Sequence, residues 1–118
     1  ALEARGIATT LEVSIAEPLP DTVETVLFRC AQEGLRNVIR HSRASNVHVK
    51  LRADAAQATL EVTDDGVGIT ADAAEQAVSG GHFGLRVLGD AVDQVAGHWS
   101  LKPVEPQGTV LKVEVPLT

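Results

Sequence analysis

Two short stretches of strictly alternating polarity place the strongest constraint on how this chain can fold. In "NVHVKLR", which starts at Asn46, the apolar residues Val47, Val49 and Leu51 alternate with polar or charged ones. Successive side chains of a β-strand point to opposite faces, so this pattern predicts a strand with one buried face. "ATLEVTD", from Ala58, alternates in the same way, and only "DAAQ" and the residues beside it connect the two stretches. The pair therefore predicts a β-hairpin.

Helical periodicity appears in two other segments. Residues 22–41 carry apolar side chains at helical spacing, namely Val23, Leu27, Ala31, Leu35 and Val38. A turn containing Pro18 and Pro20 precedes this segment, and Asp21 is its predicted N-cap. A second helix is predicted from the spacing of Leu85, Leu88, Val92 and Val95, with Gly97 at its C-cap.

Three further strands complete the prediction. Residues 7–15 alternate loosely, and "HWSLKPV" and "GTVLKVEVPL" form the last two strands. A Gly-, Asp- and Ala-rich loop is expected over residues 65–81, with one helical turn near residues 73–78. Helices interleaved with hairpin-linked strands predict an α/β fold class: a two-layer α/β sandwich with a mixed, mostly antiparallel sheet and helices on one face.

Composition limits the class of protein. The 118 residues match one ordinary domain, here residues 1–118, and 44% hydrophobic residues can form a core. A net charge of -6 without a basic cluster argues against nucleic-acid binding. The single cysteine, Cys30, cannot form an internal disulfide, which favours a reducing, cytoplasmic location. No apolar run is long enough for a membrane span, and no signal peptide is visible, so no direct membrane contact is expected. The start at Ala1, without Met, fits a fragment of a longer protein.

The first predicted helix carries an unusual polar stripe. A helix turns by about 100° per residue, so Glu33, Asn37, Arg40 and His41 of "QEGLRNVIRH" lie within about 100° of arc. Asn is a poor choice for a helix interior, because its side chain competes with the backbone for hydrogen bonds. An ordinary solvated flank would explain the charged members equally well.

Three glycine-containing motifs come later in the chain. "VTDDGVGI", from Val62, places two acids and Gly-x-Gly at a strand end, where a ligand can approach the backbone closely. "SGGHFGLRVLG", from Ser79, places glycines before a helix, where free N–H groups and the helix dipole favour phosphate. "QGTVLKVEV" opens the last strand with Gly108 and Thr109. Taken singly, these motifs could be a turn, a linker before a helix, and another turn.

Their order and spacing together are more specific. The chain resembles the ATP-binding catalytic domain of bacterial sensor histidine kinases, within the GHKL ATPase superfamily that also contains DNA gyrase. "QEGLRNVIRHSRA" resembles the N box, "DDGVG" the G1 box, "GGHFGL" the G2 box and "GT" the last glycine-threonine element. "SRASNVHVKL" after His41 is similar to the nitrate- and oxygen-sensor subfamily. The resemblance covers nearly the whole chain and implies a Bergerat-type ATP-binding fold, which is an α/β sandwich.

The resemblance implies roles at the phosphate end of a nucleotide. Asn37 would ligate Mg²⁺ through its amide oxygen, which suits a hard cation that keeps several waters. Glu33 matches the N-box acid, which orders the waters of the metal or polarises the attacked group. Arg40 matches a basic position near the terminal phosphates, and His41 matches a position that lies against the nucleotide. The G2 elements Gly81, Gly84 and Leu85 would lie beside the phosphates.

The resemblance also implies a site for the base. Asp64 matches the G1 aspartate that accepts a hydrogen bond from the adenine amino group. Gly66 and Gly68 would let the base approach, and Thr109 would support Asp64 or an adenine-bound water. The chain departs from the wider family in its short lid, residues 69–80, and in having Gly89 within the second helix. A mid-helix glycine costs up to about 1 kcal/mol of stability relative to Ala.

The implied function is transfer of the ATP γ-phosphate, with Mg²⁺, to a histidine on a separate dimerisation domain. None of the four histidines precedes an acid, so the acceptor is expected outside this chain, on the parent kinase's own dimerisation domain. A response regulator would act downstream, and the parent could be membrane-anchored. Two alternatives remain: an anti-sigma-factor serine kinase, and a nucleotide-binding regulatory module without chemistry. No His/Cys spacing suggests zinc, and no nucleophile elbow is present.

Overall fold

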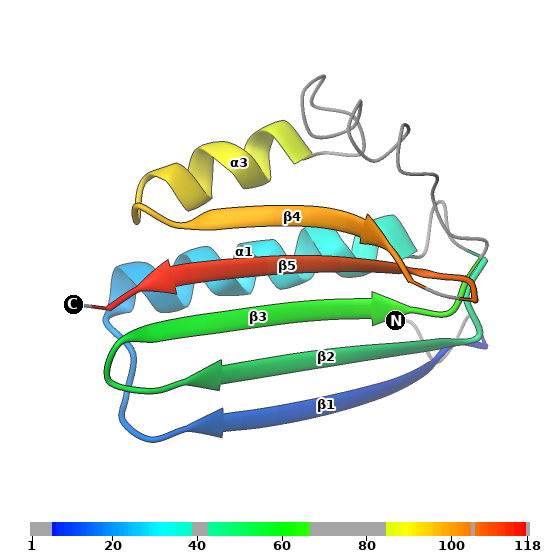
Figure 1. Ribbon diagram of the computed structural model, residues 1–118, viewed down its shortest axis with the longest axis horizontal. Helices are drawn as coiled ribbons and strands as arrows, with labels where there is room; N and C mark the ends of the chain where they lie inside the picture. Colours follow the sequence, from blue (N-terminus) through cyan, green and yellow to red (C-terminus); the bar gives the residue numbers. More distant parts are fainter. Residues whose placement is uncertain (1–5, 39–42, 67–84, 105, 118) are drawn as a thin grey trace.

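A five-stranded sheet with helices on one face forms the framework of the computed structural model (Figure 1). The structure describes residues 6–38, 43–66, 85–104 and 106–117, without the side chains of residues 85–87. Its elements, in chain order, are β1 (Ala8–Ile15), α1 (Asp21–Asn37), β2 (Asn46–Ala53), β3 (Gln57–Asp64), α3 (Leu85–Asp93), β4 (His98–Pro103) and β5 (Thr109–Pro116). The predicted helical turn at residues 73–78 lies outside the described residues.

The order of strands across the sheet is β1-β2-β3-β5-β4. β1 pairs with β2 in parallel, and the other three pairings are antiparallel. The predicted mixed, mostly antiparallel sheet is therefore confirmed, as is the β2–β3 hairpin, in which Leu51 lies opposite Leu60. Asp54 closes this hairpin, because its Oδ1 accepts hydrogen bonds from the backbone N–H groups of Ala56 (2.7 Å) and Gln57 (2.9 Å).

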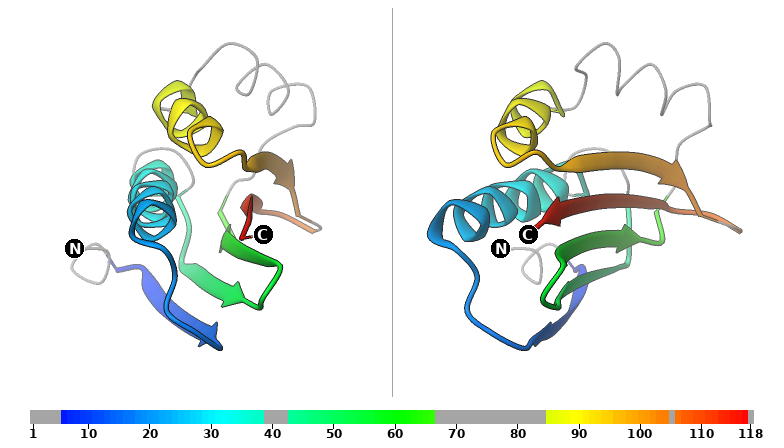
Figure 2. Two further views of the ribbon diagram at one scale, coloured as in Figure 1. Left: turned by 90° about the vertical axis from the view of Figure 1, so that its left-hand side faces the viewer. Right: turned by 60° about the vertical axis from the view of Figure 1, so that its left-hand side comes forward.

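The core lies between the sheet and the two helices (Figure 2). Alternation along β2, β3 and β5 directs Val47, Leu60 and Val113 to the helix-covered face, where all three are buried. Gly34 brings α1 close to the sheet, since a Cβ at this position would lie 3.1 Å from side-chain atoms of both Val62 and Leu111. This contact fixes which part of α1 lies above which part of the sheet.

The predicted strand β1 is present, but its apolar side chains on the core side of the sheet remain exposed. Leu11 and Val13 point to the same side of the sheet as the core, yet they are 66% and 57% exposed. The reason is that α1 packs against β3 and β5, the middle of the sheet, and leaves the edge strand uncovered. Within the described part of the chain, no helix has the length and apolar character needed to cross a membrane.

Both predicted helix caps need correction. Asp21 is the first helical residue, not the N-cap; Pro20 holds that position and makes no capping side-chain hydrogen bond. Asp21 and Glu24 instead place negative charge in the first turn, where the helix dipole favours it. At the end of α3, the residue with positive φ is Ala96 (φ 56°), whereas Gly97 donates its N–H to the Val92 carbonyl at 3.0 Å. Gly97 has a different role, because a Cβ there would lie 2.8 Å from the Glu114 carbonyl oxygen.

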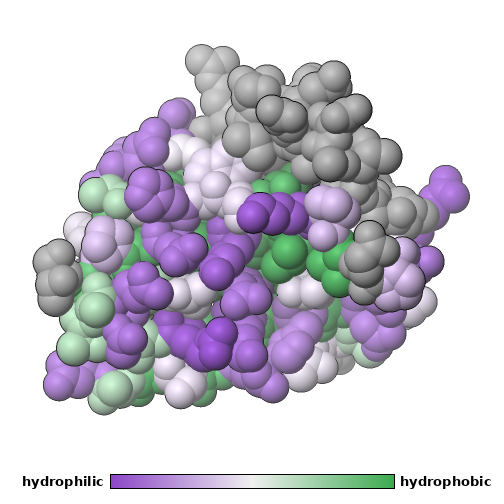
Figure 3. Space-filling view, in the orientation of Figure 1, coloured by the Kyte–Doolittle hydropathy of each residue, from purple (hydrophilic) through white to green (hydrophobic). Residues whose placement is uncertain are grey.

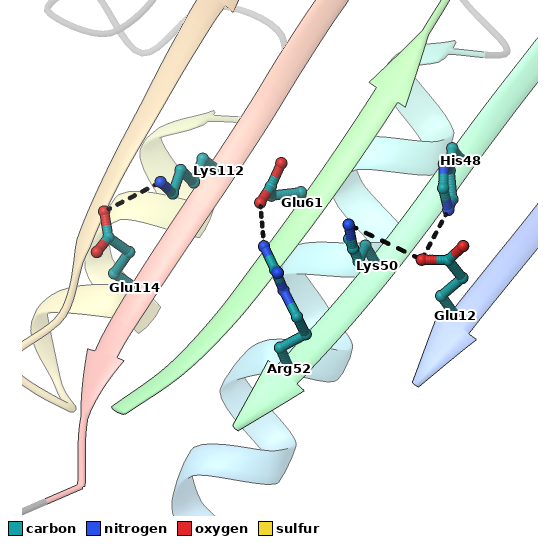
Figure 4. Close-up of polar contacts among 7 residues, drawn as sticks. All are labelled: Glu12, His48, Lys50, Arg52, Glu61, Lys112 and Glu114. Atoms are coloured by element: carbon teal, nitrogen blue, oxygen red, sulfur yellow. Dashed lines mark ion pairs between the residues drawn. The ribbon is translucent and has the colours of Figure 1, made fainter. Parts of the chain in front are cut away.

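The face of the sheet opposite the helices is hydrophilic (Figure 3). Polar and charged side chains from neighbouring strands approach one another across it: Glu12 with His48 (3.5 Å) and Lys50 (3.9 Å), and Arg52 with Glu61 (3.5 Å) (Figure 4). These side chains are 27–56% exposed, and ion pairs that water reaches contribute little to stability. A shallow hollow on this face lies at the end of the hairpin near Asp54, away from Asp64. The open face therefore behaves as an ordinary solvated surface.

Candidate functional site

Asp64 is the last residue of β3 and is buried, with 8% exposure. Its neighbours across the sheet are Val47 of β2 and Thr109 of β5. Asp64 shares the helix-covered face with Val62, because residues two apart on a strand point the same way. The structure thus places a carboxylate at the end of the apolar layer, where the sequence predicts the base-reading aspartate, with Thr109 directly beside it.

The two oxygens of Asp64 differ in their contacts with the described residues. Oδ1 accepts a hydrogen bond from the backbone N–H of Gly66 at 2.8 Å. Among the described residues, no donor contacts Oδ2. Burial raises the pKa of Asp64, partly offset by the Gly66 N–H, while the nearby charge of Asp65 raises it further. The result is a buried acceptor with spare hydrogen-bonding capacity, which suits recognition of a donor on a ligand.

Gly108 lets β5 begin directly against the end of β3. Its φ is +120°, a region that L side chains rarely adopt, and a Cβ there would overlap the backbone oxygen of Asp64. The following residue, Thr109, is then the register partner of Asp64. The sequence suggested only a turn at Gly108, whereas the structure gives the reason for glycine: two backbones meet at the site.

Asp65 is a residue whose position the sequence prediction missed. Its Oδ1 accepts hydrogen bonds from the backbone N–H groups of Ser45 (2.9 Å) and Asn46 (2.8 Å), and its Oδ2 accepts one from Asn46 Nδ2 (2.8 Å). These contacts, led by the Asn46 side chain, lower the pKa of Asp65. The only signal in the sequence is the second acid of "DDG", which does not reveal its partners 19 and 20 residues earlier.

Glu33 and Asn37 lie one turn apart near the C-terminal end of α1, and both are partly buried. Gly34 contacts Val62 and Leu111, each two residues from Asp64 or Thr109. α1 runs in the same general direction as β3 (Figure 1), so Asn37 lies further towards the end of the sheet that holds Asp64. The structure therefore brings Glu33, Asn37, Asp64 and Thr109 to one end of the molecule.

Glu33 forms an ion pair within α1. Its Oε1 lies 3.5 Å from Nη1 of Arg36, three residues along the helix. The remaining predicted site residues lie at or beyond the limits of the described residues. Leu85 is the first residue of α3, without a described side chain, and outside the described residues lie Arg40, His41, Gly68, Gly81 and Gly84.

The donor set on α1 fits a magnesium ion better than a transition metal. Within the described ranges, no group of three His, Cys, Asp or Glu side chains is placed to hold a metal. An amide and a carboxylate four residues apart instead offer one hard oxygen ligand, from Asn37, and an acceptor for metal-bound water, from Glu33, on one helix edge. Mg²⁺ prefers such oxygens, keeps several waters and takes its remaining ligands from phosphates. Glu33 and Asn37 therefore fit that ion chemically.

Comparison with known proteins identifies a matching family and several relatives. Residues 22–118 match the family model described as histidine kinase-, DNA gyrase B-, and HSP90-like ATPase. The sensor histidine kinase NarS of Mycobacterium tuberculosis is 35% identical over 91% of this chain and 25% of its own length. The nitrate/nitrite sensor protein NarX of Escherichia coli is 31% identical over 74% of this chain and 14% of its own. The chain thus spans a quarter or less of these two relatives.

A solved structure shows the same fold. The mycobacterial sensor histidine kinase MprB superimposes with a TM-score of 0.71 over 97% of this chain and 85% of that chain, at 22% sequence identity. Matches to NarS and NarX confirm the predicted resemblance to sensor histidine kinases, including those that sense nitrate. The likeness to MprB confirms the predicted arrangement of sheet and helices.

Proposed function

The chain belongs to the family of histidine kinase-, DNA gyrase B-, and HSP90-like ATPases, and we propose that it binds Mg·ATP and donates the γ-phosphate to a histidine on a separate dimerisation domain. The observation that carries the proposal is that Asp64, buried at the end of β3, lies at the same end of the molecule as Glu33 and Asn37 near the C-terminus of α1. The relatives NarS and NarX are both named as sensors, which favours a histidine acceptor in a longer kinase.

Asp64 would read the base. Its Oδ1 is held by the Gly66 N–H, which leaves Oδ2 to accept a hydrogen bond from the adenine amino group. Thr109 on the neighbouring strand would support this carboxylate or a water bound between it and the base. Gly66, and Gly68 beyond the described residues, would allow the ring to approach the backbone.

Glu33 and Asn37 would act at the phosphates. The Asn37 amide oxygen would hold Mg²⁺, and Glu33 would order its water ligands. When bound, Mg²⁺ supplies charge neutralisation at the phosphate oxygens. Arg40, His41 and the loop glycines Gly81 and Gly84 would complete the phosphate contacts, and Leu85 would adjoin them at the start of α3. Catalysis would then consist mainly of positioning and electrostatic stabilisation of the transferred group.

Phosphotransfer in trans tests the proposal directly. Incubated alone with γ-labelled ATP, the chain should acquire no stable acid-labile phosphate, because none of its histidines resembles an acceptor. Addition of the dimerisation domain of the parent kinase should produce a labelled acceptor histidine. Label on a serine of an added protein would instead indicate the anti-sigma-factor kinase, and nucleotide binding without any transfer would indicate a regulatory module. Stable label on His41, His48, His82 or His98 of the isolated chain would contradict the proposal.

A further inference from the structure

The geometry points to Asp65 as a positioning residue for Asp64, because Asp65 ties both neighbouring segments of the sheet to the end of β3. This inference rests on the proposed role of Asp64 as reader of the adenine base. Asp65 itself is partly buried and comes directly after the last residue of the strand. A strand end is free to fray unless it is held, so the orientation of a terminal side chain depends on how the next residue is anchored.

The first connection runs to β2. The Asp65 carboxylate accepts three hydrogen bonds, from the N–H groups of Ser45 and Asn46 and from the Asn46 side chain, at 2.8–2.9 Å. In return, the Asp65 N–H donates to the Asn46 carbonyl at 3.2 Å. Asn46 immediately precedes Val47, which is the register partner of Asp64. These bonds therefore extend the β2–β3 pairing one residue beyond Asp64.

The second connection runs to β5. Nε2 of Gln107 donates a hydrogen bond to the Asp65 carbonyl at 2.8 Å. Gln107 precedes Gly108, which lies against the Asp64 backbone, and then Thr109, the other register partner of Asp64. Asp65 is thus bonded to the segments on both sides of Asp64. These bonds hold the backbone of Asp64 and of the segments on both sides of it, whereas the Asp64 side chain receives, from the described residues, one hydrogen bond, that of the Gly66 N–H.

Ser45 also connects this cluster to the sheet edge. Its carbonyl accepts a hydrogen bond from the N–H of Ala8, at the start of β1, at 2.9 Å. The Asp65 carboxylate therefore acts at the point where β1, β2, β3 and the approach to β5 converge. Loss of this carboxylate should loosen the strand end and let Asp64 rotate away from the geometry that suits the adenine amino group.

The chain offers a matched control at the other end of the same hairpin. Asp54 is another carboxylate, here exposed, whose Oδ1 accepts hydrogen bonds from two backbone N–H groups, those of Ala56 and Gln57. Like Asp65, its pKa is lowered by these hydrogen bonds. A purely structural role for Asp65 would make Asp65→Ala and Asp54→Ala equivalent in every measurement on the folded protein.

The experiment measures Mg·ATP and Mg·GTP binding by calorimetry, with thermal unfolding alongside, for the unmodified chain, Asp65→Ala, Asp65→Asn and Asp54→Ala. Both alanine variants should lower the Tm. Only Asp65→Ala should weaken ATP binding, by about three- to tenfold, the loss expected for one to two hydrogen bonds, and lower the ATP-to-GTP affinity ratio. Asp65→Asn keeps an acceptor oxygen for the two backbone amides and should recover most of that ratio.

Unchanged ATP affinity and ratio in Asp65→Ala, or equal losses for ATP and GTP, would overturn the inference while leaving the proposed function standing. An unmodified chain that binds both nucleotides equally would remove the adenine assignment and this inference together. If Asp65→Ala does not fold, Asn46→Ala, which deletes only the side-chain contact to Oδ2, decides between the same outcomes.

Discussion

The burial of the Asp64 carboxylate favours binding of a ligand donor but disfavours folding when the carboxylate is charged. Burial raises its pKa, so the charged carboxylate is less stable in the folded chain than in the unfolded one. The stability linked to this group is therefore greatest below the ordinary aspartate pKa, and it falls as the pH rises through the raised folded value. Above that folded pKa, the fold carries an ionised carboxylate that a ligand donor would compensate.

Asp64→Asn should therefore separate stability from recognition. At neutral pH the variant should have a higher Tm than the unmodified chain, because it removes a buried charge and keeps an oxygen for the Gly66 N–H. ATP affinity should fall, and the ATP-to-GTP ratio should shrink from at least about tenfold, since an amide can turn its NH₂ towards the guanine carbonyl. Thermal unfolding and competition binding measure the two effects. Equal ATP and GTP affinity in the unmodified chain would disprove base reading by Asp64.

At Gly108, both the backbone conformation and the space around it disfavour any side chain. Gly108→Ala should lower the free energy of unfolding by more than about 2 kcal/mol, because positive φ costs roughly 1–2 kcal/mol and the new Cβ would overlap the Asp64 backbone. Gly6→Ala is the control: Gly6 also has positive φ (+79°), but nothing lies within 4 Å of its Cβ position. Denaturant unfolding should show the smaller, purely conformational loss there. Equal losses would mean that the close approach at Gly108 has no cost.

At the scale of elements, the end of α3 needs a left-handed backbone conformation at one residue and close backbone packing at the next. Ala96 takes the left-handed conformation that glycine favours, while Gly97 lies where a Cβ would be 2.8 Å from the Glu114 carbonyl oxygen. Ala96→Gly should raise the free energy of unfolding by about 0.5–1 kcal/mol. Gly97→Ala should lower it by about 1–3 kcal/mol through overpacking. Chemical denaturation of both variants checks the signs, and a stabilising Gly97→Ala would contradict this account.

Strands with one buried face could be predicted from the sequence, whereas the ends of the helices could not. Alternation in β2 and β3 depends on one buried face, so the sequence alone predicts their pairing and the burial of Val47 and Val62. Helix ends depend on local hydrogen bonds, and the predicted caps at Asp21 and Gly97 were wrong by one residue each.

Features of the site that depend on contacts distant in sequence were also missed. The bonds of Asp65 to Ser45 and Asn46 join two segments that no periodicity connects. The exposure of β1 was missed for a related reason: alternation predicts a strand, but only the placement of α1 decides which strands it covers. The position of Asp64 could be predicted, because a motif at a strand end needs only the strand itself.

For the molecule as a whole, the candidate site spans two layers that the fold holds in register. Asp64 belongs to the sheet, while Glu33 and Asn37 belong to α1, and Gly34 sets the separation of the layers through its contacts with Val62 and Leu111. A nucleotide bound here would place its base against the sheet and its phosphates near the end of α1. The two halves of the site should therefore act on different parts of one ligand.

Variants in the two layers should have separable effects on binding. Asn37→Ala should weaken ATP binding mainly in the presence of Mg²⁺, with an unchanged ATP-to-GTP ratio and an unchanged fold, since Ala is well tolerated in helices. Asp64→Asn should change the ratio and leave the Mg²⁺ dependence intact. The double variant should show the sum of the two losses in binding free energy, because each residue contacts a different part of the nucleotide. Titration calorimetry with and without Mg²⁺ on all four proteins measures this, and an unaltered Mg²⁺ dependence in Asn37→Ala would exclude Asn37 as the metal ligand.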